Sequence, residues 1–144
     1  MAIERFQAWV LVGSCAIAGS VSAQQTNPLI GKWHGTVHMA ENYDMPYEII
    51  YYPDNTYLQT MAVPPNRDTH TGSGTVYIRG QYRMTSDHSV EVSVAETKLC
   101  PAGKPNVCKA MPSKGGGTQT ISFRMEGPDK AINTVNGQVS YRVR

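Results

Sequence analysis

Cys100 and Cys108 have the most readily assigned chemistry in this sequence. They are the two cysteines that remain if the first 23 residues are an export signal. An even number of cysteines in an exported chain indicates a disulfide, whereas a zinc site would need further Cys or His ligands close by. We therefore predict one disulfide between them, which stabilises the fold by about 2–3 kcal/mol because it restricts the unfolded chain.

His34 and His38 are the residues that suggest a metal site. Both belong to a predicted β-strand, where their spacing places them roughly 13 Å apart at about 3.3 Å per residue. A zinc ion lies only about 2 Å from each of its ligands, so one ion cannot reach both imidazoles. We expect both side chains to face solvent, and the sequence predicts no metal site.

The sequence contains no motif of a known catalytic centre. It lacks G-x-S-x-G and H-E-x-x-H, and the glycines at 115–117 have no Lys-Ser or Lys-Thr beside them for phosphate binding. Glu91 and Glu126 are the one carboxylate pair to consider, but both fall at outward-facing strand positions. The sequence therefore predicts neither a catalytic residue nor a cofactor, and an enzyme is only the third hypothesis.

Long and aromatic side chains recur at positions that are predicted to face inward. These candidate ligand-binding residues are Met39, Tyr82, Met84, Phe123, Met125 and Tyr141. Either they line a cavity for a small apolar ligand, with the tyrosine hydroxyls orienting it, or they fill the interior completely. Methionine adapts its shape to its surroundings and suits both alternatives.

The elements that position these residues are β-strands. In Leu29–Met39, Gly31, Trp33 and Val37 alternate with polar residues, which predicts a strand with one buried face. Further strands are predicted at 45–52, 56–61, 75–85, 89–94, 118–126, 131–135 and 138–144. Most are joined by short turns, and Gly80 suggests a bend within its strand. The sequence predicts an all-β fold, an eight-stranded antiparallel up-and-down β-barrel, with one long connection at 98–117.

The first 23 residues have the features of a signal peptide. An apolar run follows Arg5, and Val21-Ser22-Ala23 supplies small residues before a cleavage point at Gln24. We expect residues 24–144 to form a single β-barrel domain in the periplasm or outside the cell. The alternative is lipidation of Cys15, which would anchor the protein to a membrane. A net charge of +2 without basic clusters argues against nucleic-acid binding.

Short motifs resemble those of small secreted bacterial lipocalin-like (calycin-type) barrels. Gly31-Lys32-Trp33 matches the G-x-W pattern at the first strand of that family and also resembles the start of the avidins. Pro53–Tyr57, Gly80–Tyr82 and Ser140–Arg144 are similar to its turn-and-strand units. The T-D-Y type turn of true lipocalins is absent, which favours a looser relative. The mature chain has one tryptophan, whereas an avidin would need several.

The resemblance implies structural roles for three residues. Gly31 and Trp33 belong to the G-x-W motif, whose tryptophan packs at the closed end of the barrel in this family. A basic residue of the last strand, Arg142 or Arg144, is implied to cross its indole ring, a cation–π contact of about 0.5–2 kcal/mol.

Two functions from different classes follow from the sequence. The first is a non-enzymatic binding module for a small apolar ligand held in the barrel. The second is an envelope structural or protein-interaction module with a filled barrel. Tyrosines cluster near the predicted first hairpin, at Tyr43, Tyr47, Tyr51, Tyr52 and Tyr57. They form either an exposed surface for a protein partner or ordinary strand residues.

Overall fold

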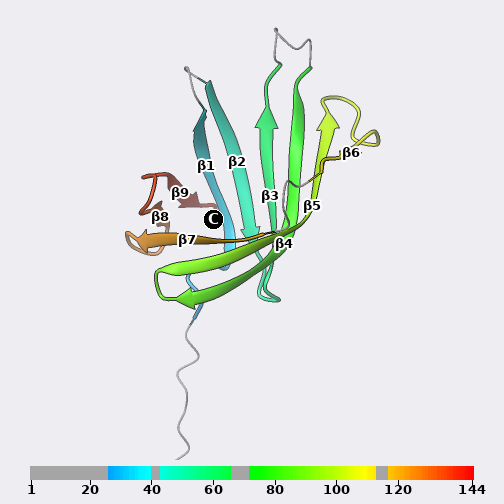
Figure 1. The fold of residues 1–144 in the computed structure, drawn as a ribbon. Helices are drawn as coiled ribbons and strands as arrows, with labels where there is room; N and C mark the ends of the chain where they lie inside the picture. Colours follow the sequence, from blue (N-terminus) through cyan, green and yellow to red (C-terminus); the bar gives the residue numbers. More distant parts are fainter. Residues whose placement is uncertain (1–25, 40–42, 66–71, 113–116) are drawn as a thin grey trace, which may run out of the picture.

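The protein folds as an all-β chain in a computed structural model (Figure 1). The structure describes residues 26–39, 43–65, 72–112 and 117–144, and within these ranges no helix is long and apolar enough to cross a membrane. Its strands are β1 (Gly31–Met39), β2 (Tyr43–Tyr51), β3 (Thr56–Val63), β4 (Gly74–Ser86), β5 (Ser89–Pro101), β6 (Lys109–Ala110), β7 (Thr118–Met125), β8 (Lys130–Asn133) and β9 (Val139–Arg142).

Eight of these strands close into a barrel. The order around it is β1, β2, β3, β4, β5, β7, β8 and β9, and pairing of β9 with β1 completes the ring. Every pair is antiparallel, and neighbours in the ring follow one another along the chain apart from β6. β6 is a two-residue strand that adds to the far end of β5. The predicted eight-stranded up-and-down barrel is confirmed.

Strand pairing fixes which side chains face the interior. Trp33 of β1 stands opposite Ile49 of β2 and Arg142 of β9. Directly paired residues share one face of a sheet. The interior therefore receives every second residue on either side of this row, as the alternation in β1 and β4 predicts.

A β-bulge lies where β4 and β5 bend. The register shifts between Arg79 and Gly80, so that Ala95 has no partner on β4. A Cβ atom at residue 80 would collide with the carbonyl oxygen of Ser93, so only glycine fits at the predicted bend. The predicted end of the fifth strand at residue 94 is wrong. The extra residue breaks the alternation there, and β5 continues to Pro101 along the first half of β4.

The predicted face of the last strand is also wrong. Tyr141 was expected inside but is 47% exposed, because it pairs with the outward-facing His34. Ser140 and Arg142 face inward instead, opposite Gly35 and Trp33. When the pairing register of a strand shifts by one residue, every side chain moves to the opposite face of the sheet. Here the pairing of Arg142 with Trp33 sets the register of β9, and so decides which residues face inward.

The predicted disulfide between Cys100 and Cys108 is confirmed. The two sulfur atoms are 1.97 Å apart, and the bond joins the end of β5 to the loop that precedes β6. The expected signal peptide, with its alternative lipidation residue Cys15, lies outside the described residues.

Candidate functional site

One end of the barrel is sealed around Trp33, which is 1% exposed. Its indole N–H donates a hydrogen bond to the Leu29 carbonyl oxygen at 2.7 Å. The buried core cluster around it contains Leu29, Trp33, Tyr51, Tyr57, Tyr82, Val90, Val92, Phe123 and Ala131. The segment before β1 contributes Leu29 to this cluster.

Arg142 is the basic residue that crosses the indole. Its Cζ atom lies 4.3 Å from the Trp33 ring centroid, within cation–π range. The guanidinium also donates hydrogen bonds to the carbonyl oxygens of Pro28 (2.7 Å), Ile30 (2.6 Å) and Pro128 (3.0 Å). Gly31 leaves room for this guanidinium and its three hydrogen bonds, which together are called the fork of Arg142. Its φ is +122°, and a Cβ atom there would lie 2.7 Å from Nη1 of Arg142.

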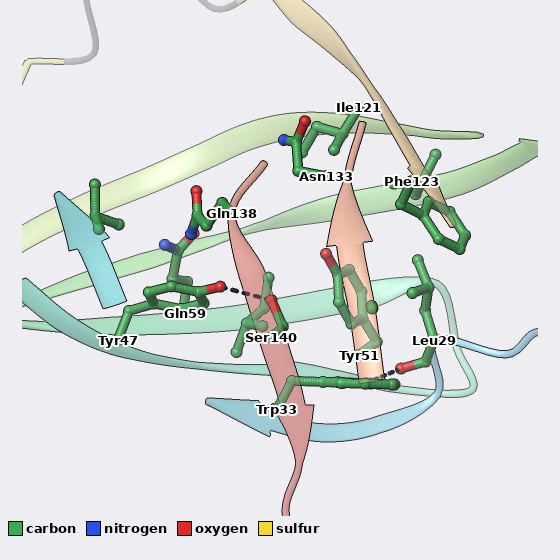
Figure 2. Close-up of a pocket in the computed structure, with 14 residues that line it drawn as sticks. Leu29, Trp33, Tyr47, Tyr51, Gln59, Ile121, Phe123, Asn133, Gln138 and Ser140 are labelled. Carbon is green, nitrogen blue, oxygen red and sulfur yellow. Dashed lines mark hydrogen bonds between the residues drawn. The ribbon is translucent and has the colours of Figure 1, made fainter. Parts of the chain in front are cut away.

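Beyond Trp33 the interior opens into a cavity of about 200 Å³ (Figure 2). Its described lining residues are Leu29, Trp33, Val37, Tyr47, Ile49, Tyr51, Gln59, Val90, Ile121, Phe123, Ala131, Asn133, Gln138 and Ser140. Most of the lining is apolar or aromatic. Amide and hydroxyl groups from β3, β8, β9 and the turn before β9 complete it. The cavity thus combines apolar walls with a few neutral polar groups.

Some polar groups of the lining are already engaged by the protein. The hydroxyls of Tyr47 and Ser140 are 2.6 Å apart and hydrogen-bonded across the barrel. Gly35 makes this possible, since a Cβ atom there would lie 2.5 Å from the Tyr47 hydroxyl. The side-chain oxygen of Asn133 accepts the N–H groups of Val135 and Asn136 in the β8–β9 turn.

The cavity carries no formal charge on the part of the chain that the structure describes. None of its described lining residues is Asp, Glu, Lys, Arg or His. Burial raises the pKa of Tyr51 well above its ordinary value, and the neighbouring Tyr47, Tyr57 and Tyr82 add to the effect. The phenol is therefore neutral, and remains a hydrogen-bond donor, throughout the physiological pH range.

The candidate ligand-binding residues fall into three groups. Phe123 lines the cavity. Tyr82 is buried in the core beside it, and Met84 and Met125 pack against that core. Met39 and Tyr141 are each 47% exposed. Tyr141 lies on the outer face, so its predicted inward orientation is wrong. Met39 is in phase with Trp33 on β1, as predicted, but is not covered. Met39 ends β1 beyond the part of that strand that β9 covers, which leaves its side chain open to solvent.

The polar part of the lining was missed by sequence reasoning. It consists of Gln59, Asn133, Gln138 and Ser140. Gln59 could have been found from its strand, since it falls in phase with Tyr57 and Met61 on the same face of β3. The other three depend on the register of β8 and β9, which only the contact with Trp33 sets.

The outer face of the barrel holds the remaining titratable candidates. His34 is exposed beside Tyr141, with ring centroids 5.9 Å apart, and His38 contacts Asp44. Within the described ranges no group of three or more His, Cys, Asp or Glu residues is placed to hold a metal.

Glu91 and Glu126, the carboxylate pair considered from the sequence, both form ion pairs on this outer face. Glu91 pairs with Arg83 at 2.9 Å, and Glu126 pairs with Lys130 at 2.6 Å and Arg124 at 3.2 Å. The hydrogen bond from Lys130, followed by that from Arg124, lowers the pKa of the Glu126 carboxyl. Both carboxylates are therefore solvated ion-pair partners.

The tyrosine cluster does not form an exposed surface. Tyr47, Tyr51 and Tyr57 are 6%, 8% and 5% exposed and face the interior, while Tyr52 is 38% exposed. The side chain of Tyr43 is outside the described residues. Most of this cluster thus builds the barrel interior.

Comparison of the chain with protein-family models returns no match, and comparison with curated proteins returns none either. The function must therefore be argued from the geometry of the barrel.

Proposed function

We propose that this protein is an exported, non-enzymatic binding module that holds one small apolar molecule inside its barrel. The observation behind the proposal is the cavity next to Trp33, whose lining is mostly apolar with a few neutral polar groups. Small-molecule sites are typically apolar hollows with a few polar groups that orient the ligand. The barrel interior has this composition.

The volume of the cavity limits the size of the ligand. Ligand pockets commonly measure about 300–1,000 Å³. An engineered apolar cavity of about 150 Å³ takes up benzene. At about 200 Å³, the cavity suits a substituted single ring. Long-chain lipids and polycyclic ligands are too large for it.

The family proposal is a lipocalin-like, calycin-type barrel. It is supported by the closed antiparallel ring of eight strands, by Gly31 and Trp33 at the start of β1, and by Arg142 across the indole. The disulfide agrees with a periplasmic or secreted location, since disulfides persist in oxidising compartments. Intact mass of protein expressed from the full chain tests this. A chain starting at Gln24 supports export as a soluble protein, and a lipid-modified Cys15 would show anchoring.

Uptake of isopropylbenzene tests the binding function. We expect a saturable shift of the methyl NMR signals of Leu29, Val90 and Ile121, which line the cavity. The methyls of Val107 serve as the control, because this residue is 53% exposed and does not line the cavity. If the cavity methyls do not shift, the barrel is effectively filled. A structural or protein-interaction role would then replace the binding role.

A matched pair of variants locates the binding within the barrel. Val37 lines the cavity, and its neighbour Thr36 is exposed on the outer face of the same strand. Val37→Phe fills the cavity and should abolish uptake of isopropylbenzene, whereas Thr36→Phe should leave it unchanged. Equal effects of the two substitutions would place the ligand elsewhere.

A further inference from the structure

The hydroxyl of Tyr51 differs from the other polar groups in the barrel. Tyr51 is 8% exposed, and its ring is held by an edge contact with Tyr82 (centroids 4.9 Å apart, 76°) and a tilted contact with Tyr57 (6.3 Å). Figure 2 shows the ring rising from β2 with its hydroxyl directed into the cavity. The ring is thus fixed by aromatic packing, while its polar tip enters the ligand space.

Neighbouring tyrosines have partners that Tyr51 lacks. The Tyr82 hydroxyl donates to the Tyr52 carbonyl oxygen at 2.7 Å and accepts from the Asn27 amide at 3.2 Å, and the Tyr47 hydroxyl pairs with Ser140. Among the residues that the structure describes, no hydrogen bond to the Tyr51 hydroxyl is formed, and no buried side-chain polar atom is left without a partner. The Tyr51 hydroxyl is therefore accessible from the cavity, where a bound molecule can supply its hydrogen-bond partner.

We propose that Tyr51 is the residue that selects the ligand, and that it donates a hydrogen bond to a neutral acceptor oxygen, such as a carbonyl, on a compact single-ring molecule. This inference rests on the proposed binding function and adds the chemical class of the ligand. Tyr51 belongs to the same buried cluster as Leu29, Trp33 and Phe123, which would surround the ring of the ligand, so the acceptor is attached close to that ring. A polar substituent further out would meet the amides of Gln59 and Gln138.

The absence of charged groups in the described cavity lining limits the chemical class of the ligand further. Burial keeps the Tyr51 phenol protonated, so the group offers a donor and no negative charge. None of the described lining residues supplies a cation for a carboxylate or an anion for an amine. A charged group brought into an apolar site without a counter-charge is strongly disfavoured. Carboxylic acids and amines of the same shape should therefore be rejected.

Three molecules of nearly equal shape separate these contributions: acetophenone, isopropylbenzene and benzoate. The first has the neutral acceptor, the second lacks the acceptor, and the third carries a charge. We expect acetophenone to bind about tenfold more tightly than isopropylbenzene, the effect of one hydrogen bond, and benzoate not to bind detectably. Affinities are read from the same methyl shifts in protein from the full chain.

Tyr51→Phe tests the assigned residue directly. It should weaken acetophenone binding about tenfold and leave isopropylbenzene binding unchanged, which a general loss of structure would not do. Tyr57→Phe is the matched control, because Tyr57 is equally buried but does not line the cavity, and it should alter neither affinity. Thermal unfolding and amide spectra establish that both variants are folded.

The outcomes distinguish this inference from the function on which it rests. If all neutral probes bind equally, or if Tyr51→Phe has no effect on acetophenone, the Tyr51 inference is overturned and the binding function stands. If benzoate binds best, the argument from charge is overturned. If no probe shifts the cavity methyls, the proposed function itself fails.

Discussion

The interior of this barrel contains two neighbouring regions that use polar groups in opposite ways. At the sealed end, the indole N–H of Trp33 and the guanidinium of Arg142 reach backbone carbonyl oxygens. In the cavity beside it, the Tyr51 hydroxyl and the amides of Gln59 and Gln138 have no hydrogen bond with the protein among the described residues. Polar groups that are hydrogen-bonded within the protein stabilise the fold, whereas polar groups without a protein partner can hydrogen-bond to a ligand. The difference separates the part that holds the fold from the part that recognises a ligand.

The sealed end should dominate stability. Trp33→Ala removes the most deeply buried aromatic side chain together with its cation–π contact. We expect the free energy of unfolding in urea to fall by about 3–5 kcal/mol. His34→Ala, at the exposed neighbouring position, should change it by no more than about 0.5 kcal/mol. Similar losses for the two variants would show that the sealed end is not the stabilising centre.

The hydrogen-bonding fork of Arg142 should be the next largest contribution. Arg142→Lys keeps the positive charge but cannot reach Pro28, Ile30 and Pro128 together. We expect a loss of about 2 kcal/mol in unfolding free energy. The matched control is Arg144→Lys, because the Arg144 side chain is 80% exposed and, among the described residues, forms an ion pair with Asp129 alone. Equal losses of unfolding free energy in the two variants would mean that the hydrogen-bonding fork of Arg142 does not contribute to stability.

Alkaline pH should weaken the fold through the interior tyrosines. Burial raises the pKa of Tyr51, Tyr57 and Tyr82, so these groups stay neutral in the folded protein while the unfolded chain ionises. Their contribution is complete below the ordinary tyrosine pKa of about 10 and is lost as the pH rises above it. Each tyrosine should add a slope of up to about 1.4 kcal/mol per pH unit.

Urea titrations from pH 9 to about 11.5 measure this slope. Tyr51→Phe should make this slope shallower by the contribution of one tyrosine. A slope that is the same with and without the substitution would contradict the assignment of Tyr51 to the tyrosines that stay neutral in the folded protein.

How far the sequence predicts this molecule depends on the strand. In β1 and β4 the apolar residues alternate regularly, and the strands and their inner faces were predicted correctly as far as Val37 and Met84. In β9 the apolar residues lie on the outer face, because the inward positions are taken by Ser140 and Arg142. Local alternation cannot reveal this, since the phase is decided by a contact with Trp33 from the opposite end of the chain.

The candidate site was harder to predict than the fold. The apolar half of the cavity was anticipated only through Phe123, and the polar half comes from strands whose relative register is a property of the closed barrel. Bulges add to the difficulty, because the unpaired Ala95 shifts the pattern of β5 midway. The sequence nonetheless predicted the disulfide and the closed barrel from cysteine number and strand count.

The comparison between Tyr51 and Tyr82 tests the central claim most directly. The two side chains are adjacent and similarly buried, but only the Tyr82 hydroxyl has protein partners in the described structure. In protein without ligand, Tyr82→Phe should lower the free energy of unfolding by about 1–2 kcal/mol, and Tyr51→Phe should change it by less than about 0.5 kcal/mol. Equal losses for the two variants would show that Tyr51 serves the fold and would contradict a cavity prepared for a ligand.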